Sequence, residues 1–236
     1  MSEHENEFKK AAAESAVKLV RDGMVVGLGT GSTAKFAVDA LGRRVKEGLR
    51  IIGIPTSERT AEQARDLGIT LATLAEQPGI DITIDGADLV ETGTLNLVKG
   101  HGGAVLREKI VASASKKLVI IVHSSKVINQ LPNGDLVPVE VVTFGWQATE
   151  RHLAKLGAKP VLRLNSFGQP SRTDGGNYTL DCTFPQGVVA AALAKELDHI
   201  TGVIEHGFFI GMASEVHVAA ADGVRVLSPS GSKASA

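Results

Sequence analysis

Short apolar segments, each leading into a polar or glycine-rich loop and then a helical pattern, recur along the first 130 residues. The first unit has an apolar run at 24–27, the loop Gly-Leu-Gly-Thr-Gly-Ser-Thr at 27–33, and a helical pattern over 34–46. Further apolar runs follow at 51–54, 69–74, 80–84, 95–98 and 118–122, with helical patterns at 57–68 and 104–115. This alternation predicts an α/β fold with a mostly parallel sheet and helices on both faces.

The rest of the chain predicts a helix before this sheet and a second unit after it. Apolar residues on one stripe predict a helix over 5–22 that stops at Gly23, and these residues are Phe8, Ala12, Ala16, Leu19 and Val20. Breaking residues at 131–138 indicate a boundary. The order β-α-β-β-α-β beyond it predicts a small split sandwich, with elements at 139–142, 147–156, 160–164, 178–184, 188–197 and 203–209. A hairpin at 216–220 and 224–227 is expected to return to the main sheet.

Composition excludes several classes of protein. Hydrophobic residues make up 43% and charged residues 22%, which is ordinary for a folded globular protein. A formal charge of −1, one Trp and one Tyr provide neither the basic excess nor the stacking platforms that nucleic-acid binding needs. We expect no membrane segment and a cytoplasmic location, since no run reaches about 18 apolar residues. A single cysteine, Cys182, excludes an internal disulfide, and no histidine pair has metal-binding spacing.

The first glycine loop does not match the known nucleotide-binding loops. A dinucleotide fingerprint that starts at Gly27 needs a glycine where Ser32 stands and an acid after the next strand, where the sequence has Ile-Pro-Thr at 54–56. A Walker loop needs Gly-Lys-Ser/Thr, which is absent. Exposed N–H groups beside the hydroxyls of Thr30, Ser32 and Thr33, near a helix N-terminus, suit a monophosphate instead. A plain turn capped by Ser32 is the alternative.

The second loop is Asp-Gly-Ala-Asp at 85–88, where an apolar strand ends. Asp-Gly pairs are often simple turns, and Asp174-Gly175 in this chain is interpreted that way. Ligands bind beyond the carboxyl ends of parallel strands, however, so both carboxylates of the second loop are expected to point into such a crevice. There they could bind sugar hydroxyls or move protons between oxygens.

The third loop is Lys-Gly-His-Gly-Gly at 99–103, which also follows a strand and precedes a helix. A lysine beside exposed amides suits a developing oxyanion. Glu108 has no same-helix cation at pairing distance, so burial without a partner would raise its pKa into the range of a general base. The alternative is that residues 107–109 form a charged, solvated stretch. We do not assign catalysis to His101.

Six segments occur in one order: 29–33, Thr-Ser at 56–57, 85–88, Lys-Gly-x-Gly at 99–102, Arg-Glu-Lys at 107–109 and Ser-Lys at 125–126. In order and spacing they resemble ribose-5-phosphate isomerase of type A. The similarity continues through Pro-Val-Glu-Val at 138–141, Lys-Leu-Gly at 155–157 and Gly-Val-Ile-Glu-His-Gly at 202–207. The departures are Leu89 in place of a common acid, about one extra residue between 88 and 99, and His101 where glycine or arginine is frequent.

This resemblance implies a sugar-phosphate isomerase. The family interconverts ribose 5-phosphate and ribulose 5-phosphate through an enediol, in the non-oxidative branch of the pentose phosphate pathway, without metal or organic cofactor. It assigns catalysis to Glu108 as base, Lys99 for the enediolate, and Asp85 and Asp88 for ring opening and hydroxyl binding. Substrate contacts are expected from Thr30, Gly31, Ser32, Thr33, Asp85, Gly86, Ala87, Asp88, Lys99, Gly100, His101, Gly102 and Lys126. Lys9 is expected to add a phosphate contact.

The resemblance also implies a Rossmann-like domain with a smaller ferredoxin-like α+β domain inserted before the final strands. With the boundary indicated at 131–138, the first domain would comprise residues 1–130 and 208–229 and the second residues 131–207. The Ser-, Gly- and Ala-rich end of the chain, residues 230–236, is expected to be a flexible tail. A homodimer or homotetramer is the usual assembly of the family. Two rivals remain open on the sequence. One is a non-catalytic sugar-phosphate sensor, which would need neither Glu108 nor Lys99, and the other is a coenzyme A transferase or aminosugar-phosphate isomerase of similar fold.

Overall fold

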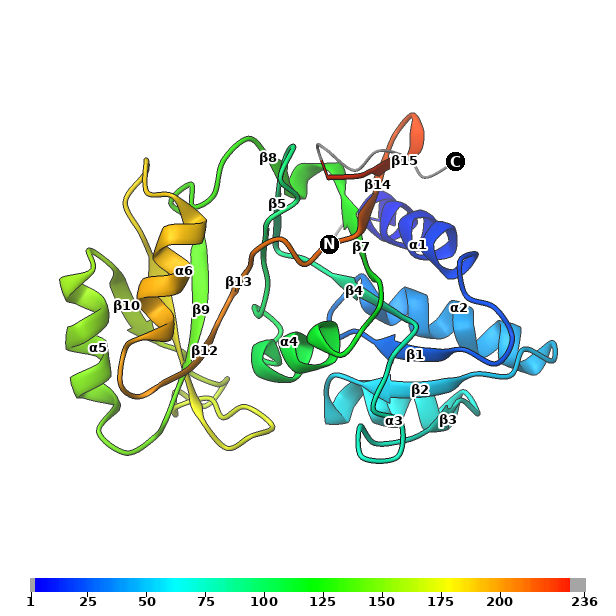
Figure 1. Cartoon of the computed structure of the whole chain (residues 1–236), viewed down its shortest axis with the longest axis horizontal. Helices are drawn as coiled ribbons and strands as arrows, with labels where there is room; N and C mark the ends of the chain where they lie inside the picture. Colours follow the sequence, from blue (N-terminus) through cyan, green and yellow to red (C-terminus); the bar gives the residue numbers. More distant parts are fainter. Residues whose placement is uncertain (1–2, 230–236) are drawn as a thin grey trace.

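The computed structural model describes residues 3–229, which form two lobes (Figure 1). The larger lobe is built on a seven-stranded sheet in the order β15-β14-β7-β4-β1-β2-β3. Strands from β14 to β3 run parallel, and β15 pairs antiparallel with β14 at the edge. The predicted mostly parallel sheet and C-terminal hairpin are confirmed. The strand bounds are β1 Val25–Leu28, β2 Ile52–Pro55, β3 Thr70–Leu71, β4 Ile82–Gly86, β7 Leu118–His123, β14 Glu215–Ala220 and β15 Gly223–Leu227.

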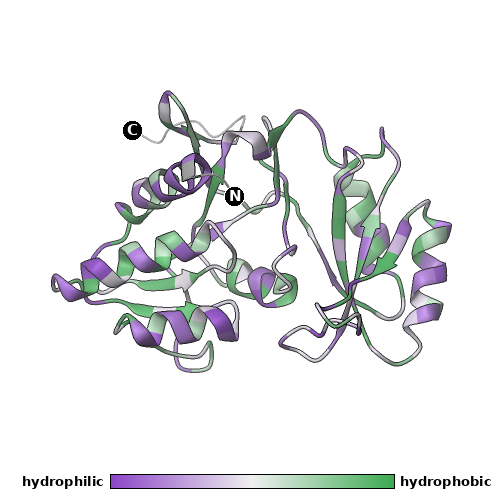
Figure 2. Ribbon diagram, turned by 180° about the vertical axis from the view of Figure 1, so that it is seen from behind, coloured by the Kyte–Doolittle hydropathy of each residue, from purple (hydrophilic) through white to green (hydrophobic). Residues whose placement is uncertain are grey.

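Helices cover both faces of this sheet, as expected. One face packs against α1 (Glu3–Val17) and α2 (Ala34–Lys46), and the opposite face packs against α4 (Val105–Ser113). Colouring by hydropathy shows hydrophobic strands between helices whose outer surfaces are hydrophilic (Figure 2). Burial of apolar side chains between these layers provides the main stabilisation of the lobe.

A local sequence signal sets the start of α3, whereas the end of α1 differs from its pattern. Helix α3 (Glu58–Asp66) begins after Ser57, whose hydroxyl accepts a hydrogen bond from the N–H of Thr60 at 3.1 Å, as an N-cap should. Helix α1 ends at Val17, five residues before the predicted end at 22, because the chain turns there to reach Gly23 at a positive φ of 80°. Val20 is still buried, so the apolar stripe predicted burial correctly although the helix ends earlier.

The smaller lobe is an antiparallel sheet in the order β10-β11-β9-β12, covered by two helices. Its β-α-β-β-α-β chain order and this strand order are those of a ferredoxin-like unit, as predicted. Alternate residues of β9, Val137, Val139 and Val141, are buried in its core beside Leu180 and Cys182. The bounds are β9 Leu136–Val141, α5 Trp146–Lys155, β10 Lys159–Leu162, β11 Tyr178–Thr183, α6 Ala190–Asp198 and β12 Val203–His206.

A third, small sheet lies between the lobes and was not predicted as a sheet, although residues 97–98 of the strand expected at 95–98 belong to it rather than to the main sheet. It contains β5 (Leu89–Glu91), β6 (Leu97–Val98), β8 (Val127–Ile128) and β13 (Phe208–Phe209). The strand expected over 203–209 is therefore wrong as one element, because it divides at Gly207. Gly207 donates to the carbonyl of Pro138 at 2.7 Å and accepts from the N–H of Lys99 at 2.9 Å, so the chain changes partner strand there. A Cβ at Gly207 would lie 2.5 Å from the Lys99 carbonyl oxygen, which requires glycine.

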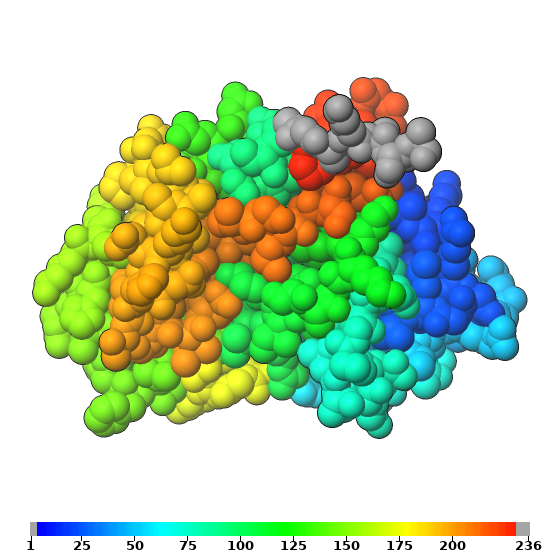
Figure 3. Space-filling view, viewed as in Figure 1, coloured from blue at the N-terminus to red at the C-terminus, as the bar shows by residue number. Residues whose placement is uncertain are grey.

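The two lobes meet along an extended contact. The segment from β12 to β14, orange in Figure 3, crosses the junction between them. The domain boundaries at 131 and 207 stay a prediction, and the predicted flexible tail at 230–236 lies outside the described residues. Within residues 3–229, no helix combines the length and apolar character needed to cross a bilayer.

Candidate active site

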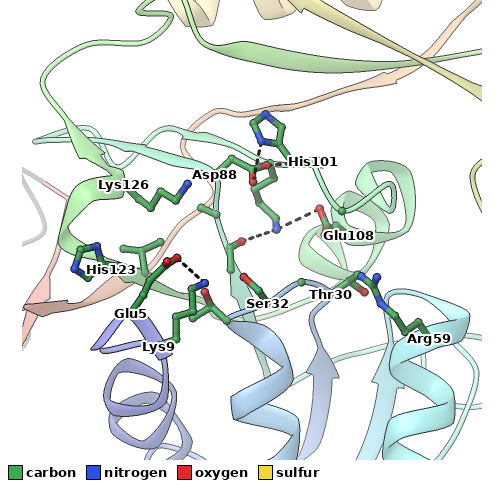
Figure 4. A pocket seen from close by; sticks show the side chains of 18 residues that line it. Glu5, Lys9, Thr30, Ser32, Arg59, Asp88, His101, Glu108, His123 and Lys126 are labelled. Carbon is green, nitrogen blue, oxygen red and sulfur yellow. Dashed lines mark hydrogen bonds and ion pairs between the residues drawn. The ribbon is translucent and has the colours of Figure 1, made fainter. Parts of the chain in front are cut away.

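A cleft of about 420 Å³ lies beyond the carboxyl ends of β1, β4 and β7. The loop before α4 and the start of α1 complete its wall (Figure 4). All the predicted site residues except Asp85 line it: Thr30, Gly31, Ser32, Thr33, Gly86, Ala87, Asp88, Lys99, Gly100, His101, Gly102, Glu108 and Lys126. Lys9 lines it too. Loops that are distant in sequence meet here because parallel strands end at the same edge of the sheet.

A buried lysine with two carboxylates lies at one end of the cleft. The Nζ atom of Lys99 is 3.0 Å from Oδ2 of Asp85 and 3.2 Å from Oε2 of Glu108, and it donates to the carbonyl of Gly86 at 2.6 Å. All three charged side chains are at most 2% exposed. The interpretation of residues 107–109 as a solvated stretch is therefore wrong for Glu108.

The numbers of positive and negative charges in this buried cluster determine which of its carboxyl groups holds a proton. Burial raises the pKa of Glu108 to about 8, although the ammonium of Lys99 opposes that rise. Burial also raises the pKa of Asp85, but two backbone N–H groups and Lys99 stabilise its carboxylate. One ammonium cannot compensate two buried carboxylates, so we place the proton on Glu108.

Glu108 differs from expectation in having a partner. This partner, Lys99, lies in the loop before α4, so it could not be found by looking for a cation on the same helix as Glu108. The Nζ atom of Lys99 lies 3.2 Å from Oε2 of Glu108, although this oxygen has no hydrogen-bond partner among the described residues. Glu108 also lines the cleft, so its carboxyl group is placed to exchange a proton with a molecule bound there.

Asp85 does not point into the crevice, contrary to expectation. Its Oδ1 accepts from the N–H of Thr30 at 3.1 Å and from its neighbour Gly86 at 2.7 Å, beneath the floor of the cleft. Gly29 permits this approach, since a Cβ there would lie 2.2 Å from Oδ1 of Asp85. Asp85 thus holds Lys99 and the first glycine loop together.

The hydroxyls of the first loop divide into two groups. The Thr30 hydroxyl is buried, within 3.0 Å of the hydroxyl oxygens of Thr56, Ser57 and Thr60, and is directed away from the monophosphate site predicted for it, whereas a substrate contact by the rest of Thr30, which lines the cleft, stays a prediction. The N-cap of α2 is Thr33, which makes no side-chain capping bond, so the alternative of a turn capped by Ser32 is wrong.

The rest of this loop is available to a ligand. Within residues 3–229, neither the hydroxyls of Ser32 and Thr33 nor the backbone N–H groups of Gly31, Ser32 and Thr33 make a hydrogen bond. Free amides at the N-terminus of α2 form a ready anion site.

Asp88 and His101 face each other at the entrance of the cleft (Figure 4). The N–H of His101 donates to Oδ2 of Asp88 at 3.0 Å, and its ring Nδ1 lies 3.4 Å from Oδ1. The other ring nitrogen is 2.9 Å from the carbonyl oxygen of Leu136 in the smaller lobe. His101 therefore bridges the lobes, and Asp88 is the carboxylate of the second loop that reaches the cleft.

Sequence reasoning missed four lining residues: Glu5, Arg59, Val122 and His123. Glu5 pairs with the buried Lys9 at 2.8 Å, and a spacing of four residues on a helix was the available signal. His123 stacks on Phe8 with ring centroids 5.0 Å apart. No local sequence pattern predicts this contact. Arg59 is exposed at the start of α3, opposite Lys126 across the cleft (Figure 4).

Outside this cleft, Asp198, Glu205 and His206 place potential metal-ligand atoms within 4.8 Å of one another. The sequence search missed this set because the three residues share no motif. The ammonium of Lys109 already pairs with Glu205 and donates to the His206 carbonyl at 2.8 Å. The positive charge of Lys109 therefore already compensates the acidic side chains of this cluster, which disfavours binding of a metal ion there.

Comparisons with known proteins agree with the geometry. The family described as ribose 5-phosphate isomerase A (phosphoriboisomerase A) matches residues 52–223. A ribose-5-phosphate isomerase A of Gloeobacter violaceus is 58% identical over 223 residues, covering 94% of this chain and 96% of the relative. One from Synechococcus is 54% identical over 223 residues, with 94% and 97% covered.

Solved structures extend the similarity to the fold. Ribose 5-phosphate isomerase A of Methanocaldococcus jannaschii superposes with a TM-score of 0.90 at 40% identity, covering 94% of this chain and 98% of that one. A D-ribose-5-phosphate isomerase in complex with phospho-erythronic acid superposes with a TM-score of 0.91 at 37% identity, with the same coverage. The chain therefore belongs to the ribose 5-phosphate isomerase A family.

Proposed function

We propose that this chain interconverts D-ribose 5-phosphate and D-ribulose 5-phosphate through an enediol, in the non-oxidative branch of the pentose phosphate pathway. One observation carries the proposal: a buried, proton-holding Glu108 lies 3.2 Å from the buried ammonium of Lys99, in a cleft with free amides in another part of its wall. A base, an oxyanion partner and an anion site are the groups that aldose–ketose isomerisation of a sugar phosphate needs. The phospho-erythronic acid bound to a structural relative is consistent with such a substrate.

The chemistry follows from the placement of these groups. In its ionised form Glu108 removes the proton from C2 of the open-chain aldose, and the electron pair moves toward O1, which takes up a proton. The O2 hydroxyl then loses its proton, the C1=C2 bond delivers its electrons to C1, and Glu108 returns the proton there. Lys99 stabilises the enediolate oxygen, and Asp88 binds hydroxyls and assists ring opening. Asp85 fixes the position of Lys99.

The direct test is a coupled assay that detects ribulose 5-phosphate formed from ribose 5-phosphate by the purified protein. Unphosphorylated ribose serves as the comparison substrate, and its kcat/KM is expected to be lower by about 10³-fold or more, because phosphate binding energy holds the reacting carbons against Glu108. Absence of turnover with ribose 5-phosphate would overturn the proposal.

The pH dependence of activity and stability follows from the raised pKa of Glu108. Since only the ionised carboxylate accepts a proton, kcat/KM should rise with pH through about 8. The free energy of unfolding should change in the opposite direction and fall as pH rises. An acid whose pKa is raised by folding stabilises the protein below its ordinary pKa of 4.5 and loses that contribution as pH rises toward 8. Urea unfolding between pH 5 and 8 should show this slope in the wild type and a weaker one in Glu108→Gln.

The phosphate is expected to bind at residues 31–33, so replacing Ser32 and Thr33 together by alanine should weaken it. We expect KM for ribose 5-phosphate and the inhibition constant of inorganic phosphate to rise in parallel, by about tenfold or more, because both lose the same hydrogen bonds. Thr92→Ala with Thr94→Ala, on a turn away from the cleft, is the control pair. A raised KM with unchanged phosphate inhibition would place the phosphate nearer Lys126.

Activity is expected to survive removal of divalent metals. Lys99 and the free amides can meet the enediolate charge, and Lys109 already neutralises the acidic cluster near His206. Exhaustive treatment with EDTA should leave kcat within about 20% of its starting value. Loss of activity that one divalent ion restores would reveal an unrecognised ligand set.

We further propose a cytoplasmic location and assembly as a homodimer or homotetramer. The single buried Cys182 suits a reducing compartment, and the family assembles in this way. Large apolar side chains such as Phe144 (93% exposed) and Phe167 (86% exposed) lie on the surface of the smaller lobe and are available for such contacts. Light scattering after size-exclusion chromatography would give the subunit number.

A further inference from the structure

The loop of Lys99, Gly100 and His101 is held from the smaller lobe by an arginine. Arg163 follows β10, and its Nη1 atom donates to the carbonyl oxygens of Gly100 at 3.1 Å and His101 at 3.2 Å. Asp181 of β11 holds this guanidinium in a two-pronged ion pair, with Nε donating to Oδ2 at 2.8 Å. Both side chains are mostly buried, 18% and 17% exposed. Because the guanidinium is planar and two of its nitrogens are held by Asp181, the direction in which Nη1 donates is fixed.

The two carbonyl bonds determine where the adjacent N–H groups point. A trans peptide is planar, so its N–H is directed opposite to its C=O. The N–H that follows the Gly100 carbonyl belongs to His101, and it donates to Asp88 at 3.0 Å on the other side. The N–H that follows the His101 carbonyl belongs to Gly102, which lines the cleft and donates to no acceptor within residues 3–229. Arg163 therefore turns one N–H toward Asp88 and leaves the next one for the cleft.

The Gly100 carbonyl also accepts from the N–H of Gly103 at 3.0 Å, but among residues 3–229 the carbonyl of His101, whose peptide leads to Gly102, has Arg163 as its donor. Gly100 and Gly103 have positive φ values of 103° and 80°, and glycine peptides rotate at little cost. If the peptide between His101 and Gly102 flipped, a carbonyl oxygen would replace the Gly102 N–H in the wall of the cleft. That oxygen would repel a developing enediolate.

We propose that Arg163, fixed by Asp181, is a positioning residue for the isomerisation: it keeps the Gly102 N–H directed at the enediolate oxygen beside Lys99. The inference rests on the proposed function. It assigns part of the catalytic geometry to the smaller lobe, more than 60 residues along the chain from the loop that it orients.

Steady-state kinetics of Arg163→Ala should distinguish this positioning role from a general disruption of the fold or the site. We expect kcat to fall by about 10- to 100-fold, because a preorganised oxyanion donor is lost, whereas the phosphate inhibition constant stays within about twofold. Arg163→Lys should be intermediate, because an ammonium can donate to the carbonyls but cannot form the fork with Asp181. Added guanidinium at millimolar concentration should restore part of the kcat of Arg163→Ala.

Arg172→Ala is the matched control, since this arginine lies in the same lobe, donates to the carbonyl of Gly176 and stacks on Tyr178 away from the cleft. Its kcat should stay within about twofold of the wild type and show no guanidinium response. Combining Asp181→Asn with Arg163→Ala should cost no more than Arg163→Ala alone, because Asp181 acts through Arg163. A kcat of Arg163→Ala within about threefold of the wild type would overturn the proposal. A parallel loss of kcat and phosphate inhibition would do so too.

Failure of the inference is distinguishable from failure of the proposed function. If the wild-type protein forms no ribulose 5-phosphate, the proposed function fails. Calorimetry then compares phospho-erythronic acid, whose carboxylate resembles the enediolate, with inorganic phosphate as ligands. Weaker binding of phospho-erythronic acid alone in Arg163→Ala would support the orientation of the loop, whereas equal changes for both ligands would contradict it.

Discussion

Replacing Glu108 by glutamine is expected to lower kcat by about 10³- to 10⁴-fold while KM changes little, since the amide keeps the shape and polarity of the side chain but cannot accept a proton. The substitution also removes a buried ionisable group whose pKa is raised to about 8, so the variant should be at least as stable as the wild type at pH 8. Coupled assays and urea unfolding measure the two effects on the same preparation.

Glu196→Gln provides the matched control, because it makes the same chemical change on the exposed side of α6, away from the cleft. Its kcat should equal that of the wild type. A second readout is the incorporation of solvent deuterium at the carbon that Glu108 reprotonates, which should disappear in Glu108→Gln. If that variant kept more than about a tenth of wild-type turnover, the base would have to be another residue.

Replacing Lys99 by methionine should damage both activity and stability. Its ammonium is 2% exposed and compensates the buried charge of Asp85, so removing it leaves a carboxylate unpaired in the interior. Loss of one partner of a buried ion pair costs about 3–5 kcal/mol of unfolding free energy. We also expect kcat to fall by about 10²- to 10³-fold, because the enediolate loses its main cationic partner.

Lys117→Met is the control for this change. Lys117 pairs with Glu215 at 3.1 Å but is 45% exposed, so its removal should cost only about 0–1 kcal/mol and leave kcat unchanged. Equal destabilisation by the two substitutions would mean that burial does not govern the Lys99 pair. Normal turnover by a folded Lys99→Met protein would exclude Lys99 as the enediolate partner.

Most elements could be predicted from local pattern because their signals lie within a few residues. The helix predicted over 34–46 is observed at those bounds, and the predicted cap at Ser57 is present. The strand predicted over 203–209 failed because its division at Gly207 depends on Pro138 and Lys99, which belong to other segments. Strands of two or three residues, such as β5 and β13, carry too little pattern to be recognised.

Within the site, the sequence determined which loops meet. Parallel strands end at one edge, so chemistry-bearing residues that follow strands converge there, and family resemblance named Glu108 and Lys99 among them. The direction of each side chain was not predictable in the same way. Asp85 and Asp88 belong to one motif, yet only Asp88 reaches the cleft, because Gly29 leaves space for Asp85 beneath the floor.

The amino-acid sequence by itself determined the order of elements and the identity of the loops at the sheet edge, because propensity, periodicity and glycine content act over short distances along the chain. Only the tertiary structure decided that Glu108 is buried with a raised pKa, that Lys99 is its partner, and that Arg163 donates to the loop between them. The physical reason is that pKa values and peptide orientation depend on burial and on charges brought together by folding, from positions that no local window contains.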